Sequence, residues 1–252
     1  QMSSWVEGRV VDVRRWTDNL FSLCVHAPEV TFTAGQFTKL ALPAPPGAKE
    51  PMLGRPYSFV NPPGAPVHEF YFVVVPEGPL SPRLAALVPG DRLWLLARAN
   101  GFFTIDEVPP APSLWCLATG TGLGPFLSML RTPAMWQRFP RVVLVHAVRY
   151  ARELVYAEEI AGIARAHPDA FRFVPVVSRE EHSAALRGRI PALLADGQIE
   201  ARAGRVLGPD TAHAMLCGNP QMVDDTQALL GERGMRRHRR REPGHVTVET
   251  YW

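Results

Sequence analysis

The stretch Leu114–Leu130, LWCLATGTGLGPFLSML, constrains the fold of this 252-residue chain more than any other part. It begins as an apolar run of strand length, passes through three alternating glycines, and continues with helical periodicity, with Pro125 in the first turn. Proline is tolerated there because the first N–H groups of a helix have no partner within the helix. A strand, a glycine turn and a helix start together form an anion site, most often for phosphate.

This glycine turn, considered alone, leaves two interpretations open. The dinucleotide-binding fingerprint has the pattern G-x-G-x-x-G, whereas the third glycine here, Gly124, comes one residue early. Glycine-rich turns between a strand and a helix also occur purely for tight packing. The turn by itself therefore predicts either phosphate binding or close approach of two segments.

The composition is typical of a globular protein, with 46% hydrophobic and 20% charged residues. No segment approaches the roughly 20 apolar residues of a membrane span, and the first residues lack the layout of a secretory signal. The three cysteines, Cys24, Cys116 and Cys217, lie far apart without a CxxC pattern. Neither a disulfide framework nor a metal site is therefore predicted, and we expect a cytoplasmic, reduced protein.

Residues 1–107 are predicted to form a small antiparallel β-barrel. Six short runs rich in Val, Phe, Leu and Tyr are separated by turn residues, and one helical piece is expected at Pro82–Leu87. The strand candidates are Trp5–Trp16, Leu20–Ala27, Gln36–Leu42, Tyr57–Asn61, Phe70–Val75 and Arg92–Ala97.

The tetrapeptide Arg55-Pro56-Tyr57-Ser58 combines an arginine, an aromatic ring and a hydroxyl within this half. Alternation along a strand puts Arg55 and Tyr57 on one face and Ser58 on the other. A guanidinium suits a pyrophosphate and a ring can stack on an aromatic ligand, although four residues alone do not exclude an ordinary strand. A second turn, Gly78-Pro79-Leu80-Ser81, is also compatible with phosphate.

Residues 108–252 are predicted to form an α/β domain with a parallel sheet. The proline-rich segment 108–113 indicates a stiff linker. Strands and helices then alternate, and in such a sheet ligands bind beyond the carboxyl ends of the strands. The predicted strands are Leu114–Ala118, Val142–Val148, Phe171–Val177 and Ala214–Cys217, and the predicted helices are Pro125–Arg131, Tyr156–His167, Ile190–Asp196 and Pro220–Arg233.

Polar groups that suit phosphate follow the ends of these strands. They are Thr119-Gly120-Thr121-Gly122, Arg149, Ser178-Arg179 and Cys217-Gly218, with Arg189 at the start of a later helix. Parallel strands would bring these groups to one edge, where guanidinium groups bind phosphate through two hydrogen bonds. No acidic residue ends the second strand to take a ribose 2′-OH, which favours NADP over NAD. For each arginine alone, a surface salt bridge is the alternative.

Four motifs resemble, in order, those of the ferredoxin–NADP reductase family, in particular its bacterial flavodoxin/ferredoxin members within the plant-type superfamily. They are RPYS at 55–58, GPLS at 78–81, GTGLGP at 120–125 and CGNP at 217–220, followed by the terminal pair Tyr251-Trp252. The match runs nearly end to end. It implies FAD in the barrel, NADP on the α/β domain, and a C-terminal tail that returns to the FAD. Pro79 departs from the family pattern, because it has no amide to offer.

The resemblance also implies the site residues. The FAD-binding set is Arg55, Pro56, Tyr57, Ser58, Tyr71, Gly78, Pro79, Leu80, Ser81, Thr119, Tyr251 and Trp252. The NADP-binding set is Gly120, Thr121, Gly122, Arg149, Ser178, Arg179, Arg189 and Gly218. Ser58, Cys217 and Glu249 are the implied catalytic residues, with Ser58 near the flavin and Glu249 as a proton-relay carboxylate. A buried cysteine at a strand end is otherwise a small packing residue.

The implied activity is that of a ferredoxin/flavodoxin–NADP(+) reductase. Such an enzyme is an FAD-dependent oxidoreductase that passes electrons between NADPH, as a hydride, and a one-electron carrier, ferredoxin or flavodoxin. The alternatives are an NAD(P)H-dependent flavin reductase or oxygenase-reductase subunit on the same scaffold, and a non-enzymatic binding module. A monomer is expected.

A basic run near the C-terminus comprises Arg236, Arg237, Arg239, Arg240 and Arg241, in a chain whose formal net charge is only +3. One interpretation is a docking patch for an acidic carrier, drawn in by complementary charge. The other is a solvated turn between the last helix and the last strand. Nucleic acid is a weaker prediction, because no aromatic residues are interleaved with the arginines.

Overall fold

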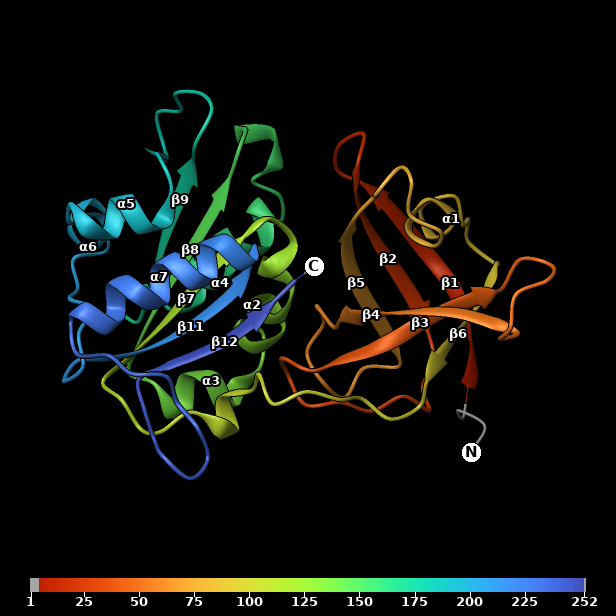
Figure 1. The fold of residues 1–252 in the computed structure, drawn as a ribbon, viewed down its shortest axis with the longest axis horizontal. Coiled ribbons are helices and arrows are strands. Elements are labelled where there is room, and N and C mark those ends of the chain that lie inside the picture. The colour runs from red at the N-terminus through yellow and green to blue at the C-terminus, as the bar shows by residue number, and fades with distance from the viewer. Residues whose placement is uncertain (1–4, 252) are drawn as a thin grey trace. The chain divides into compact units, whose positions relative to one another are not determined.

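The chain folds into two units, each built on one six-stranded sheet (Figure 1). The structure is a computed structural model and describes residues 5–251. The first unit comprises the residues up to Thr104 together with Gly124–Thr132. The second comprises Ile105–Leu123 and the residues from Pro133 onward.

The sheet of the first unit is antiparallel throughout, with the strand order β4-β3-β6-β1-β2-β5. After β4 the chain bridges to β5, where the Val60 amide donates to the Glu69 carbonyl at 2.9 Å, so the two outer strands meet. The core is apolar, with Leu23, Leu40 and Leu93 fully buried. The elements are β1 Trp5–Arg15, β2 Leu20–His26, β3 Phe37–Pro43, β4 Met52–Ser58, β5 Val67–Val73, α1 Ser81–Ala85 and β6 Arg92–Leu96. The predicted antiparallel, barrel-like first half is confirmed.

Strand β4 differs from its prediction, because it spans Met52–Ser58 rather than Tyr57–Asn61. Proline lacks the N–H that an inner strand would donate to its neighbour. However, β4 is the first strand in the sheet order and forms a ladder with β3 alone. A proline is tolerated in such an outer strand, because the strand has a neighbour on one side only. The whole RPYS motif therefore lies within a regular strand and ends it.

The sheet of the second unit is parallel throughout, with the order β10-β9-β8-β7-β11-β12 (Figure 1). The chain adds strands outward from β7 and then returns to the other side of β7 with β11, which makes a topological switch point. Strands β8 and β11 are buried along nearly their whole length, as expected for parallel strands covered on both faces. The strands are β7 Ser113–Thr119, β8 Arg141–Val148, β9 Phe171–Val177, β10 Leu186–Arg187, β11 Ala212–Gly218 and β12 Val246–Thr250.

Helices connect these strands, and Figure 1 shows α7 along one face of the sheet. Helix α7 begins where the Asn219 side chain accepts hydrogen bonds from the amides of Gln221 and Met222, with Pro220 as its first residue. The helices are α2 Leu123–Leu130, α3 Pro133–Arg138, α4 Ala157–Ala166, α5 Ile190–Ala195, α6 Gln198–Ala203 and α7 Pro220–Glu232. Of these, α3 and α6 were not predicted. The parallel sheet and its helices confirm the predicted α/β half.

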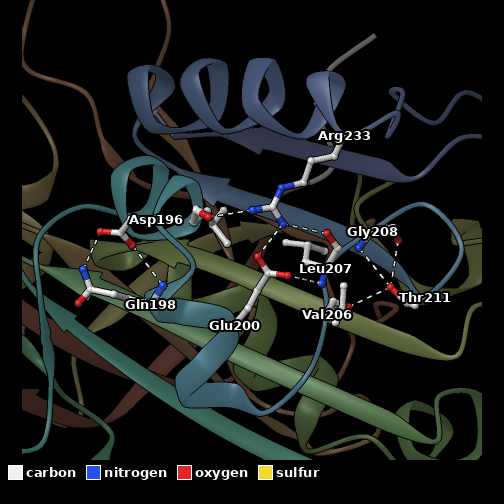
Figure 2. A network of polar contacts seen from close by, with 9 residues as sticks. Asp196, Gln198, Glu200, Val206, Leu207, Gly208, Thr211 and Arg233 are labelled. Carbon is white, nitrogen blue, oxygen red and sulfur yellow. Dashed lines mark hydrogen bonds and ion pairs between the residues drawn. The ribbon is translucent and has the colours of Figure 1, made fainter.

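A polar network fixes the helices on one side of this sheet (Figure 2). Arg233, at the end of α7, donates to the carbonyls of Leu194 and Leu207 and forms a 2.7 Å ion pair with Glu200. The second carboxylate oxygen of Glu200 accepts from the Leu207 amide at 2.9 Å. The network therefore links the end of α7 to α5, to α6 and to the loop that precedes β11.

Most of α2 belongs to the first unit, although its chain position lies between β7 and β8. The Ser128 hydroxyl donates to the Asn61 carbonyl at 2.8 Å, and Arg131 forms an ion pair with Glu69 at 3.2 Å. The apolar helix after the glycine turn is thus part of the first unit's packing. Within residues 5–251, no helix is both long and apolar enough to cross a membrane.

Candidate functional site

The RPYS motif ends β4 in the first unit. Arg55 is exposed, and one of its guanidinium nitrogens donates to the neighbouring Gly54 carbonyl at 2.8 Å. The Tyr57 ring stands edge-on to Phe72, with centroids 5.7 Å apart, and burial raises the pKa of the Tyr57 hydroxyl to about 12. Tyr57 is therefore a neutral ring, and Ser58 beside it is 9% exposed. This arrangement fits an anion near Arg55 and an aromatic group near Tyr57.

The second predicted FAD segment, residues 78–81, is a tight turn in the same unit. The Ser81 hydroxyl accepts from the Val75 amide at 2.9 Å, and the Gly78 amide donates to the Val75 carbonyl. Leu80 is 1% exposed and belongs to the core. The side chains of Leu80 and Ser81 thus serve the fold. Tyr71, also predicted, is buried on β5.

The glycine turn follows β7 in the second unit as a short 3₁₀ turn, Gly120–Gly122. Gly120 has a φ of +52°, and a Cβ there would meet nothing within 4 Å. His146 on β8 donates from Nε2 to the Gly120 carbonyl at 3.0 Å. Complete burial lowers the pKa of His146 to about 4, so the imidazole is neutral and keeps this role at neutral pH. The turn is therefore open at the Gly120 Cα and is held in place by the hydrogen bond from His146 on β8.

The ends of β7 and β11 touch at the switch point. A Cβ on Gly122 would overlap the Cys217 carbonyl, and one on Gly218, whose φ is +138°, would overlap Thr119. The Thr119 hydroxyl accepts from the Asn219 amide at 2.8 Å. Because the two strand ends approach each other so closely, only glycine fits at positions 122 and 218. This contact lies at the position where open α/β sheets bind ligands.

Three arginines stand along the same carboxyl edge. The pairing of β8 and β9 continues past their ends, where the Arg179 amide donates to the Arg149 carbonyl at 2.9 Å. Arg189 is the residue before α5. Among the described residues, none of these three exposed guanidinium groups has a hydrogen-bond or ion-pair partner. Three unpaired cations along one edge, with the Ser178 hydroxyl next to Arg179 in the chain, fit a phosphate.

The last strand brings three further predicted residues together. Cys217 on β11 is in register with Glu249 on β12, and the Tyr251 amide donates to the Gly218 carbonyl at 2.9 Å. The pKa of the fully buried Cys217 thiol lies well above its ordinary value, because burial and the nearby Glu249 both raise it. A hydrogen bond from Tyr251 lowers this pKa, but by less than the other two effects raise it. The Glu249 Oε2 atom is buried without a partner among the described residues, and burial raises its pKa to about 7. Such a carboxyl can hold a proton near neutral pH.

The basic run lies at the other edge of this sheet, because it immediately precedes the parallel strand β12. Arg240 is paired with Glu107 through two hydrogen bonds of 2.6 and 2.9 Å. Arg236 donates to the Pro243 carbonyl. Arg237, Arg239 and Arg241 have no polar side-chain partner in the part of the chain that the structure describes. Arg240 is therefore paired with a carboxylate, whereas the hydrogen bonds of Arg236 to a neutral carbonyl leave its charge uncompensated.

Comparison with known proteins identifies the family. Residues 116–228 match the family model described as the oxidoreductase NAD-binding domain. The flavodoxin/ferredoxin–NADP reductase of Escherichia coli (strain K12) is 51% identical over 252 residues, which is 100% of both chains. The chain belongs to the flavodoxin/ferredoxin–NADP reductase family.

Other members of this reductase family agree in length and fold. The ferredoxin–NADP reductase of Pseudomonas aeruginosa is 33% identical and covers 98% of each chain. The crystal structure of a ferredoxin NADP+ reductase from Neisseria gonorrhoeae, with bound FAD and NADP, is 34% identical and superposes with a TM-score of 0.91 over 98% of this chain and 99% of the other. The family resemblance drawn from the four motifs and the assignment as a reductase are thereby confirmed.

The residue assignments within this reductase remain predictions. Cys217, Glu249 and Tyr251 come together in the second unit, whereas Ser58 belongs to the first, and Trp252 lies outside the described residues. Sequence reasoning missed His146, because a histidine inside the apolar strand Val142–Val148 looks like a core residue. Aligning the two predicted strands β7 and β8 in parallel would have indicated it, because His146 pairs with Ala118, next to the glycine turn.

The raised pKa of Glu249 gives a pH-dependent stability. Between its usual pKa of 4.5 and about 7, the folded protein holds a proton that the unfolded chain has released. This contribution is fully present below pH 4.5 and is lost as the pH rises through 7, with an upper size of roughly 3 kcal/mol. We expect Glu249→Gln to remove that part of the pH dependence, measured by urea unfolding at pH 5 and pH 8. Replacing the exposed Glu232 by Gln is the control, and an unchanged pH dependence in Glu249→Gln would contradict the assignment.

Proposed function

We propose that this chain is an FAD-dependent ferredoxin/flavodoxin–NADP(+) reductase that passes electrons between NADPH and ferredoxin or flavodoxin. The observation that carries the proposal is the 51% identity to the Escherichia coli reductase over the full length of both chains. The unpaired arginines and the open glycine turn at the switch point of the sheet agree with it.

FAD supplies the redox chemistry when bound, because it accepts two electrons together from a nicotinamide and releases them one at a time. In this chain Arg55 would bind its pyrophosphate, Tyr57 would pack on the ring system, and Ser58 would lie near the reacting atom. Pro56, Tyr71, Gly78–Ser81, Thr119, Tyr251 and Trp252 complete the proposed set. The exposed cation beside a half-buried neutral ring supports this assignment.

NADP would bind at the carboxyl edge of the parallel sheet. Gly120, Thr121, Gly122 and Gly218 would face its pyrophosphate, since the open left-handed position at Gly120 lets a ligand approach the backbone. Arg149, Ser178, Arg179 and Arg189 would bind the 2′-phosphate, and this set has unpaired positive charge to offer. The carboxyl-edge glycines therefore position the coenzyme, and the arginines select NADP over NAD.

The residues at the ends of β11 and β12 would hold a proton and shape the packing around the coenzyme. Cys217 keeps a small, neutral, buried thiol at the strand end, which leaves room for a flat ring to approach. Glu249 can hold or release a proton at Oε2 near pH 7, since its pKa is about 7. Tyr251 orders this pair through its hydrogen bond to the Cys217 thiol.

The carrier would be acidic, and the unpaired Arg237, Arg239 and Arg241 would attract it. Because the basic run lies at the amino edge, away from Cys217, we assign it steering of the approach rather than contact at the redox edge. A carrier-reduction rate that does not change with ionic strength would contradict this role. We further propose a cytoplasmic monomer with domains at 1–107 and 108–252 and a tail that reaches the FAD.

An anaerobic titration tests the function. The purified protein should be yellow, and NADPH should bleach its flavin absorption at near-stoichiometric amounts, while NADH at the same concentrations should do so much less effectively. Addition of oxidised ferredoxin or flavodoxin should then restore the colour and yield the reduced carrier. A colourless protein that cannot be loaded with FAD, or equal bleaching by both coenzymes, would contradict the proposal or its NADP preference respectively.

A further inference from the structure

The two loops that carry the unpaired arginines are joined by a carboxylate. Glu180 directly follows Arg179, and its Oε1 accepts a hydrogen bond from the Ala151 amide at 2.6 Å. Ala151 comes two residues after Arg149 and begins a short 3₁₀ turn. The Glu180 side chain therefore reaches from the loop after β9 to the loop after β8.

The loop after β8 is itself closed by a second carboxylate. Glu153 accepts from the Tyr150 amide at 2.9 Å through its side chain, and its own amide donates to the Tyr150 carbonyl at 2.9 Å. Segment 150–153 is thus a closed ring of backbone and side chain. The Glu180 contact attaches this ring to the next loop, beside the backbone bond that joins Arg179 to Arg149.

A carboxylate beside this arginine edge is at first sight unfavourable for an anion site, because like charges repel. The neighbouring carboxylate, Glu181, lies 3.4 Å from Arg187 in an exposed pair. Glu180 instead satisfies an amide at the start of a turn, a group that otherwise lacks a partner. Glu180 therefore has a structural role, the hydrogen bond to the Ala151 amide, at a place where its negative charge alone would be unfavourable.

We propose that Glu180 is a positioning residue for the 2′-phosphate site, and that it sets the preference for NADP over NAD by holding Arg149 and Arg179 in one arrangement. This inference rests on the proposed function, since it assumes that these arginines bind the 2′-phosphate. Glu180 acts through the two loops and not by contact with the coenzyme.

Isothermal titration of the FAD-loaded protein with NADP+, NAD+ and adenosine 2′-phosphate tests the inference. For Glu180→Ala we expect Kd to rise about tenfold for NADP+ and for adenosine 2′-phosphate, the size of a lost charge-assisted hydrogen bond. Kd for NAD+ should change by less than about twofold, because NAD+ has no 2′-phosphate. Glu180→Gln should restore most of the affinity, since its amide oxygen can accept from the same N–H. Glu181→Ala is the matched control and should leave the NADP+ to NAD+ ratio unchanged.

Three outcomes would overturn the inference. If Glu180→Ala, Glu180→Gln and Glu181→Ala all tighten NADP+ binding, Glu180 acts by charge repulsion. If Glu180→Ala weakens NAD+ as much as NADP+, its role is general to the fold. If the wild type prefers NADP+ and Glu180→Ala keeps that preference, the inference fails while the proposed function stands. If the wild type binds both coenzymes equally, the proposed 2′-phosphate site is itself contradicted.

Discussion

Replacing Gly218 with alanine is expected to lower the thermal unfolding midpoint by about 10 °C and to abolish most NADPH-dependent activity. Two effects combine. A side chain at a φ of +138° is strained, and its Cβ would overlap Thr119 at the end of the neighbouring strand. Strain and overpacking of this kind each cost about 1–3 kcal/mol. Thermal unfolding followed by circular dichroism, together with NADPH oxidation kinetics, measures both consequences.

Gly204→Ala is the control for this substitution. Gly204 also has a positive φ, of +67°, but a Cβ there would meet nothing within 4 Å. It should show only the cost of the left-handed conformation, about 1–2 kcal/mol, with unchanged kinetics. If Gly218→Ala were no worse than Gly204→Ala, the close approach of β7 and β11 would not be a requirement of the site.

The second large effect concerns coenzyme choice. The double variant Arg179→Leu/Arg189→Leu is expected to lower kcat/KM for NADPH about a hundredfold or more, because each lost charge-assisted hydrogen bond contributes about 1.5–3 kcal/mol. NADH lacks the 2′-phosphate, so its kcat/KM should stay within about threefold. Steady-state kinetics with both coenzymes, at one ionic strength, measures the ratio.

A double variant at the opposite edge separates specific from general charge effects. Arg237→Leu/Arg239→Leu removes the same charge from the amino edge of the sheet, where neither arginine has a polar side-chain partner among the described residues. It should leave the NADPH to NADH ratio unchanged. Equal losses for both coenzymes in Arg179→Leu/Arg189→Leu would contradict the 2′-phosphate assignment.

The sequence predicted the parallel half better than the barrel half. Strand β9 occupies Phe171–Val177 as predicted, since a continuous apolar run bounded by polar residues has one natural length. Strand β4 spans Met52–Ser58 instead of the predicted Tyr57–Asn61. Proline is tolerated in outer strands, and only the sheet order shows that Pro56 lies on one. Periodicity also predicted α2, but it cannot tell which surface a helix covers. Ser128 of α2 bonds to the Asn61 carbonyl, and Arg131, just after the helix, pairs with Glu69.

The candidate site divides in a similar way. Residues whose type carries the chemistry, such as Gly120 and Arg179, were visible from local pattern and family resemblance. His146 and Glu180 were not, because the contacts from which we infer their roles join each of them to a backbone group more than 20 residues away in sequence. The amino-edge position of the basic run likewise needed the direction of β12, which the last nine residues alone do not give.

The hydrogen bonds before β12 have a consequence for the chemistry at its far end. The His245 amide donates to the Arg236 carbonyl, and the His238 amide donates to the Val246 carbonyl, so the strand enters the sheet at a fixed residue. A slip of one residue would turn every side chain of the strand to the opposite face. Val248 would then stand beside Cys217 in place of Glu249, with no titratable group there. The backbone hydrogen bonds of the basic loop therefore determine which residue of β12 lies beside the Cys217 thiol.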